Sequence, residues 1–279
     1  MDYQWYPGHM TKAVRQMKED IKLIDLVIEL LDARIPLSSR NPDIDSLGKN
    51  KSRLVLLNKS DLADEEQNNK WIQFFKEKGI IALKINSKNK QGIKEINNAV
   101  NVACKDKIER DRKKGILNRP VRAMVVGIPN VGKSTFINAY AGRSCAKTGN
   151  KPGVTKGKQW IKLNKNLELL DTPGILWPKF DDQKIGLHLA FIGSMNDNIL
   201  DTTEMAYELI NLLNIIYPEA INNRYNIEGD ADPLQVMYQI AEIRGCKLKG
   251  NQFDLDKTGG IILDDFRSGK LGRITLDRL

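Results

Sequence analysis

The segment most able to do chemistry is a glycine-rich run, GIPNVGKS over 127–134, that fits the phosphate-loop pattern G-x-x-x-x-G-K-[ST]. An apolar run at 121–126 precedes it and a helical stretch at 133–141 follows it, the context that such a loop requires. Lys133 would neutralise charge on the outer phosphates, and the Ser134 hydroxyl could ligate Mg²⁺. A chance glycine-rich turn is the alternative, and the order of strand, loop and helix disfavours it.

Two downstream segments could complete a triphosphate site. In DTPG, over 171–174, the Asp171 carboxylate could hold Mg²⁺ through water and the Gly174 N–H could meet a γ-phosphate. Thr155, in the preceding loop, has the place of the second Mg²⁺ ligand that engages only with a triphosphate. Each of these is also a common loop pattern, and each gains weight from the phosphate loop ahead of it.

A polar box, NKSD at 58–61, follows the apolar run 53–57 and favours guanine. The Asp61 carboxylate could accept hydrogen bonds from guanine N1–H and the 2-amino group, a match that adenine lacks. The Lys59 stem could pack over the ring, and Asn58 could tie the box to the phosphate loop. A surface turn is the alternative, because all four residues favour turns.

A second loop, formed by Asn86, Ser87 and Lys88, follows the next apolar run at 80–85. It resembles the other guanine-side loop of GTPases, usually S-A-K, and departs from it at two positions. We therefore give it less weight than the box at 58–61.

The elements that must position these segments are short apolar runs separated by helical stretches. Strands that alternate with helices predict a largely parallel sheet covered on both faces. A short turn at 164–166 predicts an antiparallel hairpin at the sheet edge. The apolar runs are 25–31, 53–57, 80–85, 121–126, 158–163 and 167–170, and the helical stretches are 9–24, 64–78, 90–112 and 133–141.

After Trp177 and Pro178 the strand pattern stops. Helical periodicity appears at 183–194, 202–217 and 232–244. We therefore predict a second domain that is entirely helical.

Charge is distributed unevenly along the chain, whose net charge is +9. Residues 1–182 carry a net charge of +13 and residues 183–279 carry −4. Such a basic field favours a polyanion such as nucleic acid, and a solvated lysine-rich surface is the alternative.

Several classes of protein are disfavoured by the composition. No apolar run approaches the roughly 20 residues of a membrane span. The opening residues lack the pattern of a secretory signal, so we expect a cytoplasmic protein without a membrane partner. The three cysteines, Cys104, Cys145 and Cys246, are widely spaced, which favours free thiols over a disulfide framework or a zinc site.

The order of the motifs is unusual for a GTPase. The box at 58–61 and its companion at 86–88 precede the phosphate loop, Thr155 and the segment at 171–174. This order resembles that of the circularly permuted GTPases. Within them, the chain resembles ribosome biogenesis GTPase A of bacteria over essentially its whole length. The segments that carry this resemblance are WYPGHM at 5–10, DARIP at 32–36, the basic helix before the phosphate loop and FRSGKLGR at 266–273.

The resemblance implies an α/β fold with a circularly permuted P-loop GTPase domain over 1–178, built on a six-stranded, mostly parallel sheet with helices on both faces. A small all-helical, ribosome-binding domain would follow over 183–279. It implies GTP or GDP with Mg²⁺, and roles in hydrolysis for Lys133, Thr155 and Gly174. Further nucleotide contacts would come from Asn130, Val131, Gly132, Ser134 and Thr135.

The resemblance also raises the question of what activates water. Ile175 occupies the place where many GTPases have a glutamine, so slow intrinsic hydrolysis is expected. In the family, the histidine of P-G-H-M, here His9, is implied as the replacement; a capping or surface histidine is the alternative. Asn130 matches GTPases in which this residue helps bind K⁺, and a role in stabilising the loop is equally open.

The function implied is a GTP-hydrolysing switch in late assembly of the large ribosomal subunit. The subunit precursor would activate it, ribosomal RNA would contact it, and we expect a monomer. One alternative is a GTP-dependent RNA-binding scaffold with negligible hydrolysis, which Ile175 keeps open. Another is a GTPase in tRNA modification.

Overall fold

The protein is represented by a computed structural model that describes residues 15, 17–117, 119–145, 159–171, 182–195, 201–227 and 232–279, with residues 159 and 171 described by their backbone alone. The chain forms two compact units. Unit 1 comprises Met1–Asp181 and Asp277–Leu279, and unit 2 comprises Asp182–Leu276. The sequence grouped the last three residues with the helical domain, whereas their contacts place them in unit 1.

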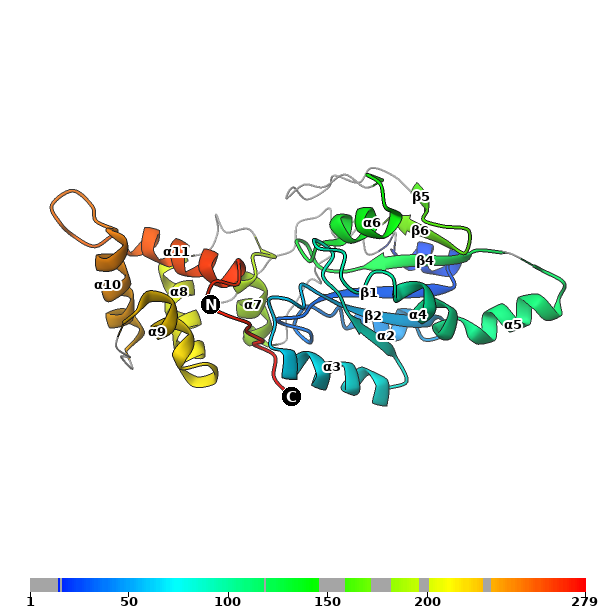
Figure 1. Ribbon diagram of the computed structural model, residues 1–279, viewed down its shortest axis with the longest axis horizontal. Helices are drawn as coiled ribbons and strands as arrows, with labels where there is room; N and C mark the ends of the chain where they lie inside the picture. Colours follow the sequence, from blue (N-terminus) through cyan, green and yellow to red (C-terminus); the bar gives the residue numbers. More distant parts are fainter. Residues whose placement is uncertain are drawn as a thin grey trace. The chain divides into compact units, whose positions relative to one another are not determined.

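Unit 1 is built on a six-stranded sheet with the order β3-β2-β1-β4-β6-β5 (Figure 1). Every neighbouring pair is parallel except β5 and β6. The mostly parallel sheet with an antiparallel hairpin at its edge is therefore confirmed. The strands are β1 (Leu26–Asp32), β2 (Ser52–Asn58), β3 (Ile81–Lys84), β4 (Val121–Val126), β5 (Gln159–Lys162) and β6 (Leu167–Asp171).

The central strand β1 is buried along its whole length, including the carboxylate of Glu29. Two guanidinium groups compensate this charge: Arg40 Nε and Arg53 Nε each donate to a Glu29 carboxylate oxygen at 3.0 Å. A buried charge without such partners would be costly, so these arginines offset the cost of burying Glu29 on the central strand.

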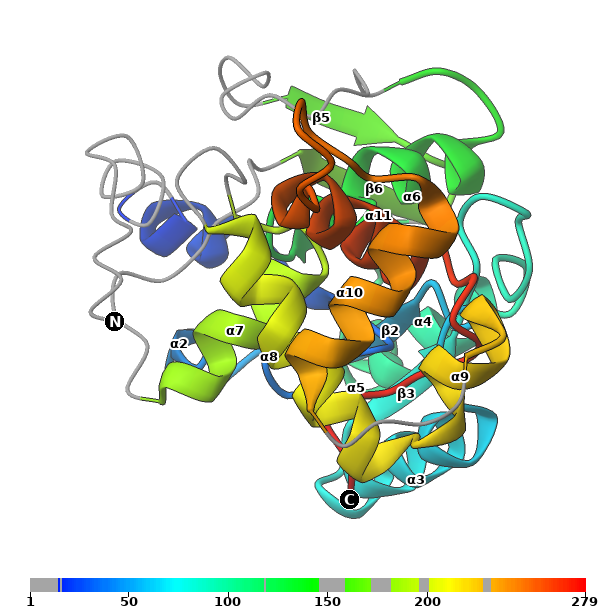
Figure 2. The same cartoon turned by 90° about the vertical axis from the view of Figure 1, so that its left-hand side faces the viewer.

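Two apolar clusters share one face of the sheet. Val27 of β1 packs in a cluster with Ile44 of α2, and Leu31 of β1 packs in another with Trp71 of α3. Because side chains alternate along a strand, Val27 and Leu31 point to the same face, which α2 and α3 therefore cover. Figure 2 shows α4 and α6 on the other side of the strands. The helices of unit 1 include α2 (Asp43–Leu47), α3 (Glu65–Glu77), α4 (Ile96–Ala103), α5 (Lys105–Lys113) and α6 (Lys133–Ala141).

The helical stretch expected over 90–112 forms two helices instead of one, α4 and α5. Helix α4 begins at Ile96, and Cys104 separates it from α5. The residues before it form a turn, closed by a bridge between Asn86 and Gln91. The apolar residues Ile96, Ala99 and Val100 bury one face of α4, whereas α5 has no buried residue.

The regular elements among the described residues of unit 2 are all helices, as the sequence predicts, and one isolated β-bridge joins Lys247 and Phe253. Asp201 caps α8 by accepting the Glu204 N–H, and Asp232 caps α10. Helices α8 and α11 pack so closely that a Cβ on Gly259 would lie 2.7 Å from the Thr202 carbonyl oxygen. The helices are α7 (Gln183–Phe191), α8 (Thr202–Ile216), α9 (Glu219–Tyr225), α10 (Pro233–Arg244) and α11 (Leu255–Arg267). No helix among the described residues is long and apolar enough to cross a membrane.

A buried carboxylate, Asp265, joins the helices of unit 2. It accepts hydrogen bonds from Arg224 Nε at 2.8 Å, Tyr225 Oη at 3.2 Å and Lys270 Nζ at 3.0 Å. Burial by itself would raise the pKa of Asp265, but its bonds with Arg224 and Lys270 outweigh burial and lower that pKa.

We expect Asp265→Ala to lower the free energy of unfolding by about 1–3 kcal/mol, a range reduced because Arg224 and Lys270 are partly exposed. Its exposed neighbour Asp264 provides the control, and Asp264→Ala should cost less than about 0.5 kcal/mol. Urea unfolding followed by far-ultraviolet circular dichroism measures both. Because the pKa is lowered on folding, this stabilisation is present above about pH 4 and declines below it. Equal losses in the two variants would contradict the role of Asp265.

Candidate functional site

The phosphate loop connects β4 to α6 and depends on backbone conformations that favour glycine. Gly132 has φ of +94° and Asn130 has φ of +60°. A Cβ on Gly132 would lie 2.6 Å from the Asn58 Nδ2 atom, and one on Gly127 would lie 2.8 Å from the Leu30 carbonyl oxygen. The two glycines therefore let the loop lie directly against β1 and the base box.

Helix α6 begins at Lys133, directly after the loop. Its first backbone N–H groups have no carbonyl partners within the helix and give this end a positive potential. The Lys133 side chain is buried at the same place, whereas Ser134 is half-buried and Thr135 is exposed. This is the arrangement of a phosphate cradle, with the Ser134 hydroxyl available to a metal ion.

The base box begins where β2 ends, and its Asn58 side chain is almost fully buried. Asn58 Nδ2 donates to the Val131 carbonyl oxygen at 2.8 Å. Asn58 Oδ1 accepts the Ser87 N–H at 3.0 Å and the Ser87 hydroxyl at 2.9 Å. One amide group therefore joins the base box, the phosphate loop and the loop at 86–88.

Lys59 makes a second connection between the base box and the phosphate loop. Its backbone has φ of +57°, a strained conformation for a lysine. Its Nζ donates to the Asn130 carbonyl oxygen and to Asp32 Oδ2, each at 2.9 Å. These bonds hold the aliphatic stem of Lys59 at the rim of the phosphate loop, where it could cover a base.

Asp32 and Arg34 support the site, although the segment DARIP at 32–36 indicated only the family resemblance, and no sequence motif gave either residue a role in the site. Arg34 donates to both Asp32 oxygens, through Nε at 2.9 Å and Nη2 at 2.8 Å, and both residues are buried. Burial alone would raise the pKa of Asp32, but the charges of Arg34 and Lys59 hold that pKa well below its usual value. The signal that could have revealed Asp32 is an acidic residue at the carboxyl end of β1. In the sheet this residue pairs with Asn58 of β2.

The loop at 86–88 lies against the base box, with its residues in different roles. Asn86 Oδ1 accepts the backbone N–H groups of Lys88 and Asn89, which shapes the turn. Ser87 contacts Asn58, and Lys88 is exposed. Ser60 of the base box makes a further contact next to this loop: its N–H and its hydroxyl both donate to the Ile85 carbonyl oxygen.

The structure describes only some of the remaining candidate residues from the sequence. Asp171 ends β6, whose parallel pairing with β4 places its carboxyl end at the same sheet edge as the phosphate loop. His9, Thr155 and Gly174 lie outside the described residues, as does Ile175. Within the described part of the chain, no group of three or more His, Cys, Asp or Glu side chains could hold a metal ion.

Comparison with known proteins gives consistent matches over the chain. Residues 122–227 match the family model described as "50S ribosome-binding GTPase". The chain is 51% identical over 278 residues to "Ribosome biogenesis GTPase A" of Bacillus cereus, covering 99% of this chain and 94% of that protein. It is 32% identical over 279 residues to the protein of that name from Thermotoga maritima, covering 98% and 94%.

Two solved structures also match almost the whole chain. The GNP-bound structure of YlqF from T. maritima has a TM-score of 0.68 at 26% identity and covers 96% of this chain and 98% of that one. The GDP-bound structure of the T. maritima protein has a TM-score of 0.69 at 26% identity and covers 95% and 99%. The fold of this chain therefore matches that protein in both nucleotide complexes.

We expect Asp32→Asn to lower the free energy of unfolding of unit 1 by about 3–5 kcal/mol, because it leaves the buried Arg34 guanidinium without its counter-charge. Asp43→Asn, which makes the same chemical change at an exposed position, should change stability by less than about 0.5 kcal/mol. Urea unfolding followed by tryptophan fluorescence gives both values.

The pH dependence of this difference is a second check. Because folding lowers the pKa of Asp32, its contribution is complete above about pH 4 and is lost as the pH falls through the lowered value. The difference in the free energy of unfolding between wild type and Asp32→Asn should therefore stay constant from about pH 5 to pH 8. A gap no larger than that of Asp43→Asn would show that the ion pair does not stabilise unit 1.

Proposed function

The chain belongs to the ribosome biogenesis GTPase A family, and from that premise we propose that it acts in late assembly of the large ribosomal subunit, whose precursor activates its hydrolysis of GTP. The family assigns a GTP-hydrolysing enzyme of ribosome assembly. The large subunit and its precursor are the proposal, supported by the 50S-binding description of the matching family model.

The observation that carries the proposed guanine-nucleotide site is the pair of connections made by Asn58 and Lys59 to the phosphate loop. These contacts support the assignment because they hold the base box beside the phosphate loop. The proposed role of the Asp61 carboxylate is to select guanine. In this proposal the base is bound by Asn58, Lys59, Asp61 and the loop at 86–88. The phosphates are bound by Asn130, Val131, Gly132, Lys133, Ser134, Thr135 and Gly174. Ser134, Thr155 and, through water, Asp171 hold Mg²⁺, which would neutralise charge on the phosphates.

Hydrolysis in this proposal depends on a partner. Ile175 stands where a water-orienting glutamine stands in many GTPases, and its side chain cannot hydrogen-bond water. His9 could act in its place when the ribosomal partner is bound. K⁺ near Asn130 could add positive charge beside the phosphates. The isolated enzyme, which we expect to be a cytoplasmic monomer, would therefore turn over slowly.

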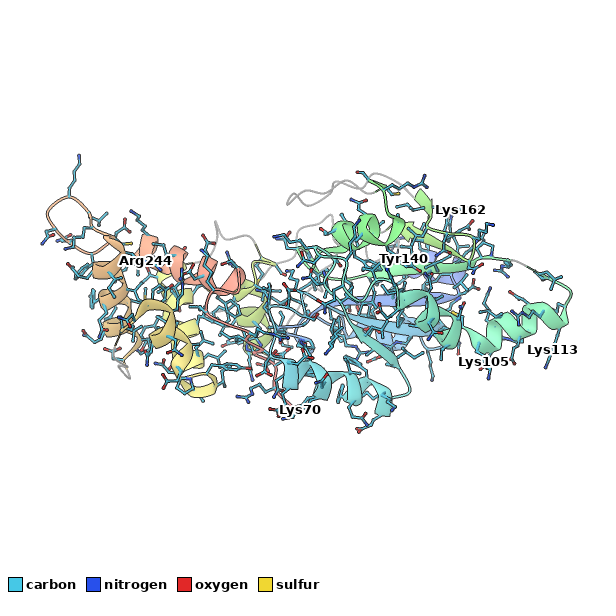
Figure 3. The ribbon with its side chains drawn as sticks, in the orientation of Figure 1. Lys70, Lys105, Lys113, Tyr140, Lys162 and Arg244 are labelled. Carbon is cyan, nitrogen blue, oxygen red and sulfur yellow. The ribbon has the colours of Figure 1, made fainter. Side chains whose placement is uncertain are left out.

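Among the described residues of unit 1, helix α5 offers an exposed basic surface that suits ribosomal RNA. None of its residues is buried, and Figure 3 shows Lys105 and Lys113 near its two ends. Lys107 pairs with Asp25 of the domain at 3.4 Å and with Asp111 of the same helix at 3.0 Å. The other basic side chains of α5 are exposed, so phosphate groups could approach them without displacing a structural ion pair. The exposed basic residues are Lys105, Arg110, Arg112 and Lys113.

GTP turnover, measured alone and with purified large ribosomal subunits, tests the proposal. Subunits should raise turnover at least about tenfold, as a partner that completes a GTPase site does. The stimulation should weaken between low and moderate salt, because RNA binding releases counterions, and K⁺ should support it better than Na⁺. Tight GTP binding without stimulation would contradict activation by the large subunit and leave the scaffold alternative.

A triple charge reversal tests the role of α5 in the same assay. Lys105→Glu, Arg112→Glu and Lys113→Glu together should raise the subunit concentration needed for half-maximal stimulation. The slope of the logarithm of the subunit affinity against the logarithm of the salt concentration should fall in magnitude by about three. Turnover without subunits should not change. The control reverses three exposed lysines on other elements, Lys22, Lys49 and Lys76. Equal effects of the two triple variants would show that only net charge matters.

A further inference from the structure

The last three residues, Asp277–Leu279, belong to unit 1, although they follow unit 2 along the chain. Asp277 is 7% exposed. Burying a carboxylate is costly unless hydrogen bonds or opposite charges compensate it. The contacts of Asp277 therefore bear on what holds it in unit 1.

The contacts of this tail are made by both side chain and backbone. The Asp277 carboxylate accepts the Ser38 N–H at 2.7 Å and the Ser38 hydroxyl at 2.9 Å. The Asp277 carbonyl oxygen accepts Trp71 Nε1–H at 2.8 Å, and the Leu279 N–H donates to Gln67 Oε1 at 3.2 Å. Ser38, Gln67 and Trp71 are all buried, so these contacts seat Asp277 in the domain, whereas Arg278 and Leu279 remain exposed.

Ser38 belongs to the compact loop that follows β1 and begins at Asp32. The next residue, Ser39, accepts the Asp32 N–H on its hydroxyl at 3.1 Å. The Ser39 N–H donates to the Ile35 carbonyl oxygen at 2.8 Å, and the Ile35 N–H donates to the Asp32 carbonyl oxygen at 3.0 Å. A displacement of Ser38 would therefore be transmitted to Asp32 through these buried hydrogen bonds.

Asp32 in turn holds Lys59 of the base box, whose Nζ lies 2.9 Å from Asp32 Oδ2. The strained backbone of Lys59, with φ of +57°, has to be maintained by such contacts. The bonded series Asp277, Ser38–Ser39, Asp32 and Lys59 thus runs from the tail to the side chain proposed to cover the guanine ring.

We propose that Asp277 is a positioning residue for the guanine site: the docked tail fixes the loop after β1, and this loop fixes Lys59 over the base. The inference rests on the proposed assignment of the base box. Release of the tail would loosen the hold on the base and accelerate nucleotide dissociation, while the phosphate loop keeps its own contacts with Asn58.

The same tail is continuous with unit 2, which gives that unit a route to the nucleotide. Thr275 is fully buried, and its N–H donates at 3.2 Å to the hydroxyl of Tyr217, the residue that directly follows α8. The chain then passes from unit 2 to unit 1 between Leu276 and Asp277. A partner that binds the helical unit could therefore change nucleotide exchange through the tail, without touching the nucleotide.

The test measures the dissociation rate of fluorescently labelled GDP from the full chain. Asp277→Ala should accelerate dissociation about five- to tenfold, within the usual range of coupling between sites. Asp264→Ala, at an exposed position of unit 2, should leave the rate unchanged. If Asp277→Ala is not folded by circular dichroism, Ser38→Ala removes the hydroxyl contact to the carboxylate and should give a smaller acceleration.

A double-mutant cycle separates positioning from a general loss of structure. In a Lys59→Ala background, Asp277→Ala should accelerate GDP dissociation by less than about twofold, because the residue through which it acts is gone. An undiminished acceleration in that background, or an unchanged rate in Asp277→Ala itself, would overturn the inference.

Asp61→Asn distinguishes failure of this inference from failure of the base-box assignment. If Asp61→Asn loses the preference for GDP over ADP while Asp277→Ala has no effect, the base box stands and the inference about the tail is wrong. If Asp61→Asn retains the full preference, the base-box assignment itself is wrong, and the inference falls with it.

Discussion

The buried amide of Asn58 is the constraint on which the rest of the candidate site depends. It satisfies the Val131 carbonyl oxygen and both donors of Ser87, and these partners lie 73 and 29 residues away in the sequence. Leaving such buried groups unpaired would cost about 1–3 kcal/mol each. The base box, the phosphate loop and the loop at 86–88 are therefore held together, although the permuted order separates them along the chain.

Buried charged side chains next to these three segments also help to hold the site in place. Asp32 connects Arg34 on one side with Lys59 on the other, and the ion pairs keep its carboxylate charged in a dry environment. Ion pairs of this kind contribute little net stability over apolar packing, but their geometry is demanding. Their value here is that they fix the direction of Lys59, and the docked tail at Asp277 supports the same loop.

The sequence predicted the parallel sheet and the adjacent base box and phosphate loop because local patterns encode them: apolar runs, glycines with special backbone angles, and turn residues. The roles of Asp32, Ser38 and Asp277 could not be predicted, because they arise from contacts across as many as 239 residues. Ser87 shows the intermediate case. Its loop departs from the usual S-A-K pattern, yet a serine hydroxyl at this position reaches Asn58.

The most direct test of the central claim is amide hydrogen exchange in the nucleotide-free protein, comparing wild type with Asn58→Ala in peptides covering 84–89 and 127–133. The account predicts that exchange accelerates in both peptides, by about tenfold or more, because one side chain restrains both loops. Faster exchange at 84–89 with unchanged exchange at 127–133 would contradict it. The phosphate loop would then hold its shape independently of the base box.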